Sequence, residues 1–91
     1  MELRCTVCVV NSQGLHARPC HAVVALALEY AADLTVCNGD QEVNGKSILA
    51  LMTLNAPQGT ELVLMANGTD GAELLERLER LFLAGFDYGE A

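Results

Sequence analysis

The spacing of hydrophobic and polar residues changes several times along the chain, and each change predicts a new element. Residues 2–10 alternate between apolar and polar side chains, which is typical of a half-buried strand. From Ala17 to Tyr30 the alternation gives way to a segment rich in Ala and Leu. This segment predicts a helix, and Pro19 is tolerated because it falls in the first turn.

The middle of the chain predicts two short strands and a short helix. Leu34 to Val36 favours a second strand, and Asn38-Gly39 is a hairpin signal that leads into a third strand over Asp40–Val43. Ser47 can then cap a helix that begins at Ile48 and ends near Leu54.

A fourth strand over Thr60–Ala66 and a last helix over Asp70–Ala84 complete the pattern. The helix carries one apolar stripe, and Gly85 is placed to end it. The order β-α-β-β-α-β-α predicts an α+β fold of two layers, with three helices on the apolar face of a sheet and solvent on the other face. Residues 1–91 show no repeat or linker, so we expect one domain.

Composition limits the classes of function. No run approaches the roughly 18 apolar residues that span a bilayer, and Met1 to Arg4 does not resemble a signal peptide, so we expect a cytoplasmic protein. The net charge of −7 argues against nucleic acid and anionic membranes as partners. Only five residues are basic, which gives weight to an arginine beside a candidate site.

Four cysteines raise the possibility of a disulfide framework or a metal site. Cys5 and Cys8 match C-x-x-C, but residues three apart on a strand point to opposite faces, so the two thiols do not converge. We therefore expect ordinary buried or half-buried cysteines, no metal and no cofactor. A metal or redox protein remains a competing class, and metal analysis would decide between them.

The candidate chemistry lies in the segment from Asn11 to Pro19, where His16 stands between a loop and the predicted start of a helix. The N–H groups and dipole at a helix N-terminus favour an anion, and neutral imidazole is a nucleophile. The planar guanidinium of Arg18 can bind two phosphate oxygens. We therefore predict that His16 accepts a phosphoryl group that Arg18 stabilises. A simpler interpretation has His16 capping the helix and Arg18 at its surface.

Two residues that follow His16 in the sequence, Cys20 and His21, are expected to have structural roles. His21 lies about 140° around the helix from His16, so the two do not share a face, and we interpret His21 as a surface or packing residue. Cys20 is interpreted as a small buried filler, with a redox-sensitive thiol as the alternative.

The string Gly14-Leu15-His16-Ala17-Arg18-Pro19 resembles the active-site signature of HPr, the histidine phosphocarrier of the bacterial phosphoenolpyruvate-dependent phosphotransferase system. A second segment, Asn44 to Met52, resembles the regulatory-serine region of that family. The resemblance extends over nearly the whole chain. It implies an open-faced β-sandwich in which three helices cover one face of a four-stranded antiparallel sheet.

The resemblance also implies partners and a mechanism. Phosphorylated enzyme I would transfer its phosphoryl group to Nδ1 of His16, Arg18 would stabilise the adduct, and an enzyme IIA-type protein would accept it. The relay would serve sugar uptake or a nitrogen-related regulatory branch. The protein would be a carrier without turnover of its own, and we expect a monomer.

The second helix is expected to contribute regulation and docking. Ser47 is an N-cap, a substrate of HPr kinase/phosphorylase, or both. Ile48 and Leu51 are assigned to the core, whereas Leu49 and Met52 are candidates for partner binding. The alternative function is a regulatory binding module controlled by Ser47 phosphorylation, although retention of the nucleophile His16 argues against this as the only role.

Overall fold

Four strands and three helices follow one another along residues 2–86, the part of the chain that the computed structural model describes. Their order is the predicted β-α-β-β-α-β-α. The elements are β1 (Glu2–Cys8), α1 (Ala17–Ala27), β2 (Asp33–Asn38), β3 (Gln41–Asn44), α2 (Ile48–Met52), β4 (Glu61–Asn67) and α3 (Gly71–Leu83).

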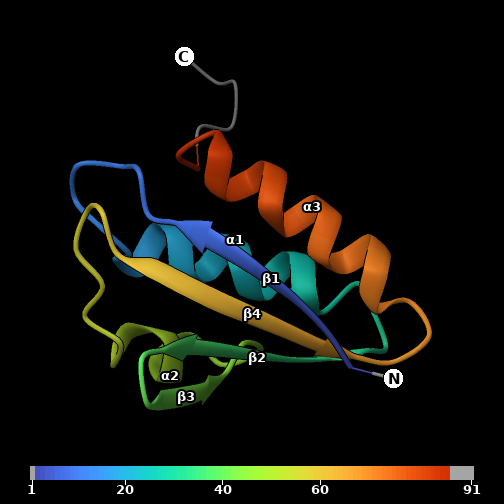
Figure 1. Ribbon diagram of the computed structural model, residues 1–91. Coiled ribbons are helices and arrows are strands. Elements are labelled where there is room, and N and C mark those ends of the chain that lie inside the picture. Colours follow the sequence, from blue (N-terminus) through green and yellow to red (C-terminus); the bar gives the residue numbers. More distant parts are fainter. Residues whose placement is uncertain (1, 87–91) are drawn as a thin grey trace.

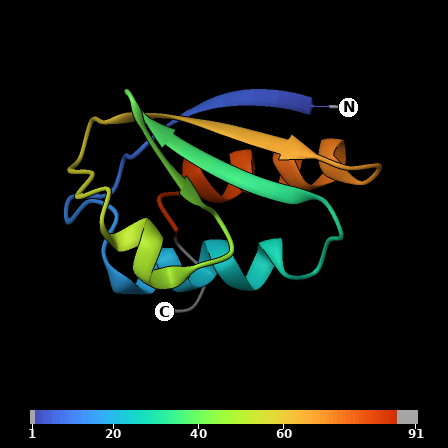
Figure 2. The same cartoon turned by 90° about the horizontal axis from the view of Figure 1, so that it is seen from below.

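The strands form one sheet in the order β1-β4-β2-β3, and all neighbouring strands are antiparallel (Figure 1). The three helices lie together on one face of this sheet, so the molecule has two layers (Figure 2). This arrangement confirms the predicted open-faced α+β sandwich. It follows from the alternation in the strands, because only one face of the sheet is apolar enough to need a cover.

The hydrophobic core lies between the sheet and the helices. Leu62 and Leu64 of β4 are fully buried, and the apolar stripe of α3 packs on β1 and β4 above them. The largest fully buried side chains in this core are Phe82, Leu34, Leu51, Leu62, Leu64, Leu74 and Leu78. The stripe predicted for α3 is thereby confirmed, with Leu81 half-buried at its margin.

The end of α3 also follows the prediction. Gly85 adopts a positive φ of 64°, its N–H donates to the Phe82 carbonyl at 3.0 Å, and the Phe86 N–H donates to the Leu81 carbonyl at 3.1 Å. This pair of bonds is a Schellman cap, which satisfies carbonyls that the helix leaves open. The cap turns Phe86 back to a T-shaped contact with Phe82, 4.8 Å between ring centroids.

Helix α1 is shorter than predicted, because it ends at Ala27 rather than Tyr30. The reason is a distant side chain. The Asp70 carboxylate, just before α3, accepts hydrogen bonds of 2.9 Å from the N–H groups of both Ala31 and Ala32. The chain is thereby held in a turn after the helix, which the local sequence could not indicate.

The hairpin turn is displaced by one position from the predicted one. Asn38 pairs with Gln41 across the two strands, so the two turn residues are Gly39 and Asp40. Gly39 has a φ of 61°, a conformation that glycine adopts without strain. The third strand consequently begins at Gln41 and continues to Asn44.

Three of the four cysteines are buried or half-buried as expected, and one is exposed. Cys5 and Cys8 do lie on opposite faces of β1, but Cys8 is exposed rather than buried or half-buried, because its side chain is on the open face of an edge strand. Cys5 is half-buried toward the helices. Cys20 and Cys37 are buried, and all four are free thiols.

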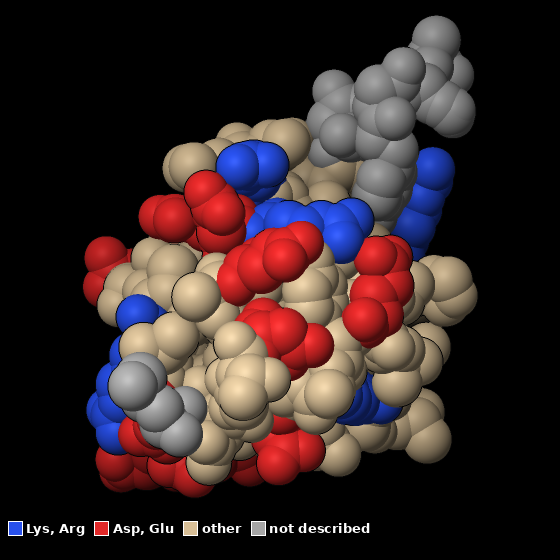
Figure 3. Space-filling view, turned by 90° about the vertical axis from the view of Figure 1, so that its right-hand side faces the viewer, with Lys and Arg blue, Asp and Glu red and all other residues tan. Residues whose placement is uncertain are grey.

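Charged side chains stay at the surface. Figure 3 shows acidic and basic groups interleaved at the end of the molecule that carries the α1–β2 and β4–α3 turns. Two ion pairs involve α3: Arg77 pairs with Glu29, in the turn after α1, at 2.9 Å, and Arg80 pairs with Glu76 at 3.2 Å. None of the helices in residues 2–86 is long and apolar enough to cross a membrane.

Replacing Asp70 with Asn should lower the melting temperature in a pH-dependent way. The hydrogen bond from Ala31, with that from Ala32, holds the pKa of Asp70 below its ordinary 3.8. A lowered native pKa stabilises the fold above the unfolded value and loses that effect as the pH falls through the native value. In thermal melts, the melting temperature of the wild type should therefore exceed that of Asp70→Asn at neutral pH, and the two melting temperatures should converge in acid. Asp40→Asn, in the exposed hairpin turn, is the control, and a gap that persists in acid contradicts the prediction.

Candidate functional site

His16 stands at the boundary between the first loop and α1. It is the N-cap residue, with extended backbone angles (φ −100°, ψ −168°), and its carbonyl accepts from the Cys20 N–H at 3.0 Å to begin the helix. The imidazole makes no capping hydrogen bond to the described helix, and the residue is half-exposed. The ring is therefore not used as a cap, and it is accessible beside the helix N-terminus, where an anion is favoured.

The loop before His16 is held by its own hydrogen bonds. The Gly14 carbonyl accepts from the Asn11 side-chain amide at 2.5 Å and from the His16 N–H at 3.1 Å. The Gly14 N–H donates to the Asn11 carbonyl at 3.1 Å. These contacts close the loop into a tight turn that leads directly to His16. Asn11 belongs to a run of turn-forming residues in the sequence, and Asn amides commonly bond nearby backbone, but the sequence alone does not show which carbonyl the amide bonds.

A second loop, between α2 and β4, supports the first. The Leu15 N–H donates to the Ala56 carbonyl at 2.8 Å, and Leu15 itself is buried. Gly14 has a φ of 72°, and a Cβ at this position would lie 2.5 Å from the Ala56 oxygen. Glycine is required here for two reasons, its positive φ and the close approach of another backbone.

His16 borders a small hollow of about 310 Å³ between the two loops. Met52, one of the predicted partner-binding residues, lies in the same hollow, whereas Arg18 does not. Its lining consists of Gln13, Leu15, His16, Met52, Asn55, Ala56 and Pro57. The sequence pattern did not identify Asn55 or Pro57, because only the tertiary structure brings their loop beside His16.

Arg18 and Cys20 occupy opposite sides of α1. Arg18 is exposed in the first turn, two residues after His16. Cys20 is fully buried beneath the loop, with its Sγ 3.8 Å from the Leu15 carbonyl. Burial raises the pKa of the Cys20 thiol to about 11, so the unreactive protonated form predominates at neutral pH. The interpretation of Cys20 as a buried filler is confirmed.

Helix α2 has the division of faces that the sequence predicts. The Ser47 hydroxyl accepts from the Ala50 N–H at 3.2 Å, which makes it the N-cap. Leu51 is buried and Ile48 is half-buried against the core. Leu49 and Met52 face solvent, with exposed fractions of 78% and 40%. Their exposure makes them available to a partner, but their role in binding stays a prediction.

The arrangement suits group transfer between proteins more than turnover of a small substrate. The nucleophilic ring lies at an accessible helix terminus beside a shallow hollow, with an arginine within one helical turn. In the described part of the chain, no cluster of three His, Cys, Asp or Glu side chains is placed to hold a metal. An accessible imidazole of this kind is what a covalent group carrier needs, because its partners must reach the carried group.

Comparisons with known proteins identify the family. A sequence model described as "PTS HPr component phosphorylation site" matches residues 3–83. HPr of Neisseria meningitidis serogroup A is 36% identical over 88 residues, which cover 97% of this chain and 99% of the relative. NPr of Shewanella violacea is 32% identical over 87 residues, 96% of this chain and 93% of the relative. The crystal structure of HPr from Thermoanaerobacter tengcongensis has a TM-score of 0.89 at 34% identity and covers 98% of both chains.

The chain therefore belongs to the HPr family, and it is a phosphoryl carrier of the phosphotransferase-system type. The function that the motif around His16 predicts is confirmed at this level. The similarity to proteins named HPr and to one named NPr covers nearly the full length of each relative.

Replacing Gly14 with Ala should destabilise the protein more than the same change at Gly39. Both glycines have positive φ, but an added Cβ meets the Ala56 oxygen only at position 14, whereas nothing lies within 4 Å at position 39. We expect Gly39→Ala to cost about 1 kcal/mol and Gly14→Ala about 2–4 kcal/mol in the free energy of unfolding. Urea titration of the two variants measures the difference, and equal costs would show that the loops can separate without penalty.

Proposed function

We propose that His16 accepts a phosphoryl group from phosphorylated enzyme I and passes it to an enzyme IIA-type acceptor. The main support is the position of His16, half-exposed at the N-terminus of the 11-residue helix α1 and held there by the turn at Gly14. The acceptor belongs to sugar uptake or to a related regulatory branch. The protein acts as a carrier and has no turnover of its own.

The transfer requires one nitrogen lone pair and one accessible phosphorus. The lone pair of His16 Nδ1 attacks the phosphorus of the donor, the new N–P bond forms, and the bond between phosphorus and the donor atom breaks. The proton on Nε2 is released as the ring becomes neutral phosphohistidine, and the departing donor group takes up a proton. Transfer to the acceptor reverses these roles, so the carrier returns unchanged.

The chain offers two sources of stabilisation for the phosphoryl oxygens. The opening N–H groups of α1 have no acceptor within the helix and carry the positive end of its dipole. The Arg18 guanidinium follows two positions later and can bind two oxygens in its planar fork. Both sources lie at the surface, which favours an adduct that forms and leaves readily over one that is trapped.

The docking surface is proposed to include Leu49 and Met52. Both are exposed apolar side chains on α2, and Met52 shares the hollow of His16. A partner that covers them reaches the imidazole at the same time. We further propose that residues 1–91 act as one HPr-like domain, as a monomer and in the cytoplasm, where the relay partners of this family work.

Ser47 is proposed to regulate docking when HPr kinase/phosphorylase phosphorylates it. The hydroxyl lies directly before α2, the helix that carries Leu49 and Met52. A phosphate adds about two negative charges there and would repel an acidic partner surface. The helix N-terminus accommodates this charge, so the fold is retained. This control acts on the carrier function and does not replace it.

Intact mass after incubation with enzyme I, phosphoenolpyruvate and Mg²⁺ tests the acceptor. The wild type should gain one acid-labile phosphoryl group, and His16→Ala should gain none. His21→Ala is the matched control, because His21 is exposed on the same helix but outside the proposed site. An adduct that survives in His16→Ala, or is lost in His21→Ala, would contradict the assignment.

Replacing Ser47 with Asp or Asn separates charge from capping. Both residues cap helices well, so urea titration should show similar stabilities for the two variants. Only Asp adds a negative charge to the docking face. We expect Ser47→Asp to be phosphorylated by enzyme I about two- to tenfold more slowly than Ser47→Asn, with the difference shrinking at high salt. Equal rates for the two variants would remove the support for control by charge.

A further inference from the structure

The hollow beside His16 is lined by neutral side chains alone within residues 2–86. Its polar side chains are the imidazole of His16 and the amides of Gln13 and Asn55, and its other lining residues are apolar. Gln13 comes from the loop before α1, and Asn55 comes from the loop between α2 and β4. A group that is carried on the imidazole and directed into this hollow would therefore meet side-chain amides.

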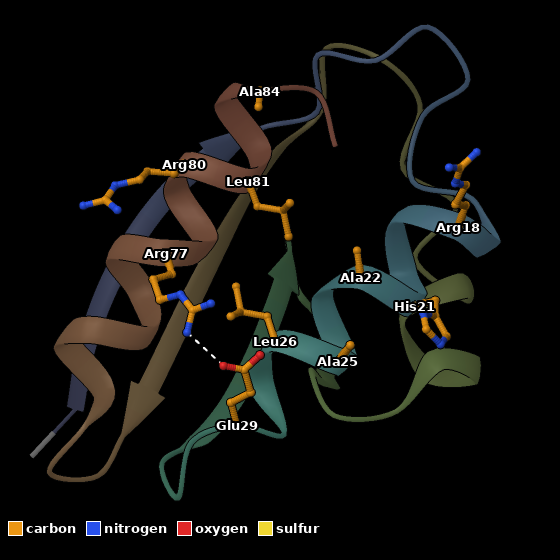
Figure 4. A pocket seen from close by; sticks show the side chains of 10 residues that line it. All are labelled: Arg18, His21, Ala22, Ala25, Leu26, Glu29, Arg77, Arg80, Leu81 and Ala84. Atoms are coloured by element: carbon orange, nitrogen blue, oxygen red, sulfur yellow. Dashed lines mark hydrogen bonds and ion pairs between the residues drawn. The ribbon is translucent and has the colours of Figure 1, made fainter. Parts of the chain in front are cut away.

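Arg18 does not border this hollow. It lines a second and larger hollow of about 720 Å³ between α1 and α3, where Figure 4 shows it at the start of α1 and the ion pair of Arg77 with Glu29 farther along the helices. A phosphoryl group has three acceptor oxygens, and the planar fork of one arginine binds two of them. An oxygen directed into the hollow beside His16 consequently needs a donor from the lining of that hollow.

Asn55 is held beside His16 by the contact between their loops. The Leu15 N–H donates to the Ala56 carbonyl at 2.8 Å, and His16 directly follows Leu15. Asn55 directly precedes Ala56, so this bond keeps Asn55 and His16 at the same hollow. The Asn55 N–H also donates to the Met52 carbonyl at 3.3 Å. The backbone of Asn55 is thus in place before a phosphoryl group arrives, which lowers the entropic cost of a hydrogen bond between them.

The backbone of Asn55 favours glycine, and its side chain has no hydrogen-bond partner among the described residues. Its φ is 47°, and Phe86 is the only other non-glycine residue with a positive φ within residues 2–86. Asparagine tolerates this conformation because its short side chain can bond nearby backbone. The exposed side chain of Asn55 makes no such bond to the described part of the chain. Its amide is therefore available to a ligand at the hollow.

We propose that the side-chain amide of Asn55 donates a hydrogen bond to a phosphoryl oxygen on His16. The inference rests on the proposed function, because the ligand is the group that His16 carries. A neutral amide binds a phosphoryl oxygen less strongly than a second arginine would, so the group can still leave. Gln13 lines the same hollow, but its side chain has one more rotatable bond and loses more conformational entropy when it is fixed.

A competition for phosphoryl groups tests this hydrogen bond. Equal amounts of the wild type, labelled with a heavy nitrogen isotope, and of Asn55→Gly are mixed with catalytic enzyme I, Mg²⁺ and too little phosphoenolpyruvate to phosphorylate all of the carrier. By microscopic reversibility, enzyme I passes phosphoryl groups between the two chains until their shares, measured by intact mass, no longer change. A catalyst does not alter an equilibrium, so the final shares report the stability of the phosphorylated chains and are insensitive to a docking defect.

We expect the equilibrium constant for phosphorylation of Asn55→Gly to be about three- to tenfold below that of the wild type, the effect of one hydrogen bond at an accessible site. Glycine retains the positive φ, and thermal melts confirm that the variant is folded. Asn55→Asp should lower the constant further, because its carboxylate repels the phosphoryl oxygens. Gln41→Glu adds the same charge on β3, outside the lining of the hollow, and should compete as well as the wild type.

NMR of the wild type tests the contact directly. Phosphorylation should shift the side-chain amide resonance of Asn55, which is assigned by its loss in Asn55→Gly, and should leave that of Gln41 in place. An Asn55 resonance that does not move, or an equal share of phosphoryl groups for Asn55→Gly, would overturn the inference while leaving transfer to His16 intact. A wild type that gains no phosphoryl group would overturn the proposed function, and this inference with it.

Discussion

The backbone of Gly14 lies against the carbonyl of Ala56 so closely that a single added carbon atom would collide with it. This approach joins two loops that are far apart in the sequence, and the hydrogen bond from Leu15 to the same carbonyl fixes it. The direction in which the chain enters α1 depends on this contact, and with it the position of the His16 ring. Sheet and helices serve to bring the two loops to one end of the molecule.

A group that two partners must reach cannot be held in place by burial. In this protein the position of the ring is fixed by the loop that precedes it, where Asn11, Gly14 and Leu15 make hydrogen bonds, while the imidazole stays accessible. Helix α2 completes the surface by presenting Leu49 and Met52 outward and anchoring Leu51 inward. The same short helix therefore contributes to the core with one face and leaves two apolar side chains exposed on the other, where we propose that partners dock.

Features encoded by neighbouring residues could be predicted from the sequence. The cap at Ser47, the helix end at Gly85 and the stripe of α3 all depend on residues a few positions apart. Features that depend on distant residues could not. The end of α1 is set by Asp70, and the hollow beside His16 by the loop at Ala56. Cys8 was misjudged because alternation does not show that β1 is an edge strand.

No Asp, Glu, Lys, Arg or His side chain among residues 2–86 is buried, and the core is made of apolar residues, with Tyr30 at its margin. A carrier gains and loses about two units of charge in every cycle of phosphorylation. When all other formal charges are solvated, water and counter-ions absorb that change, and no interior group has to reorganise. Donor and acceptor can then meet the same molecular shape, which lets two unrelated proteins share one binding surface.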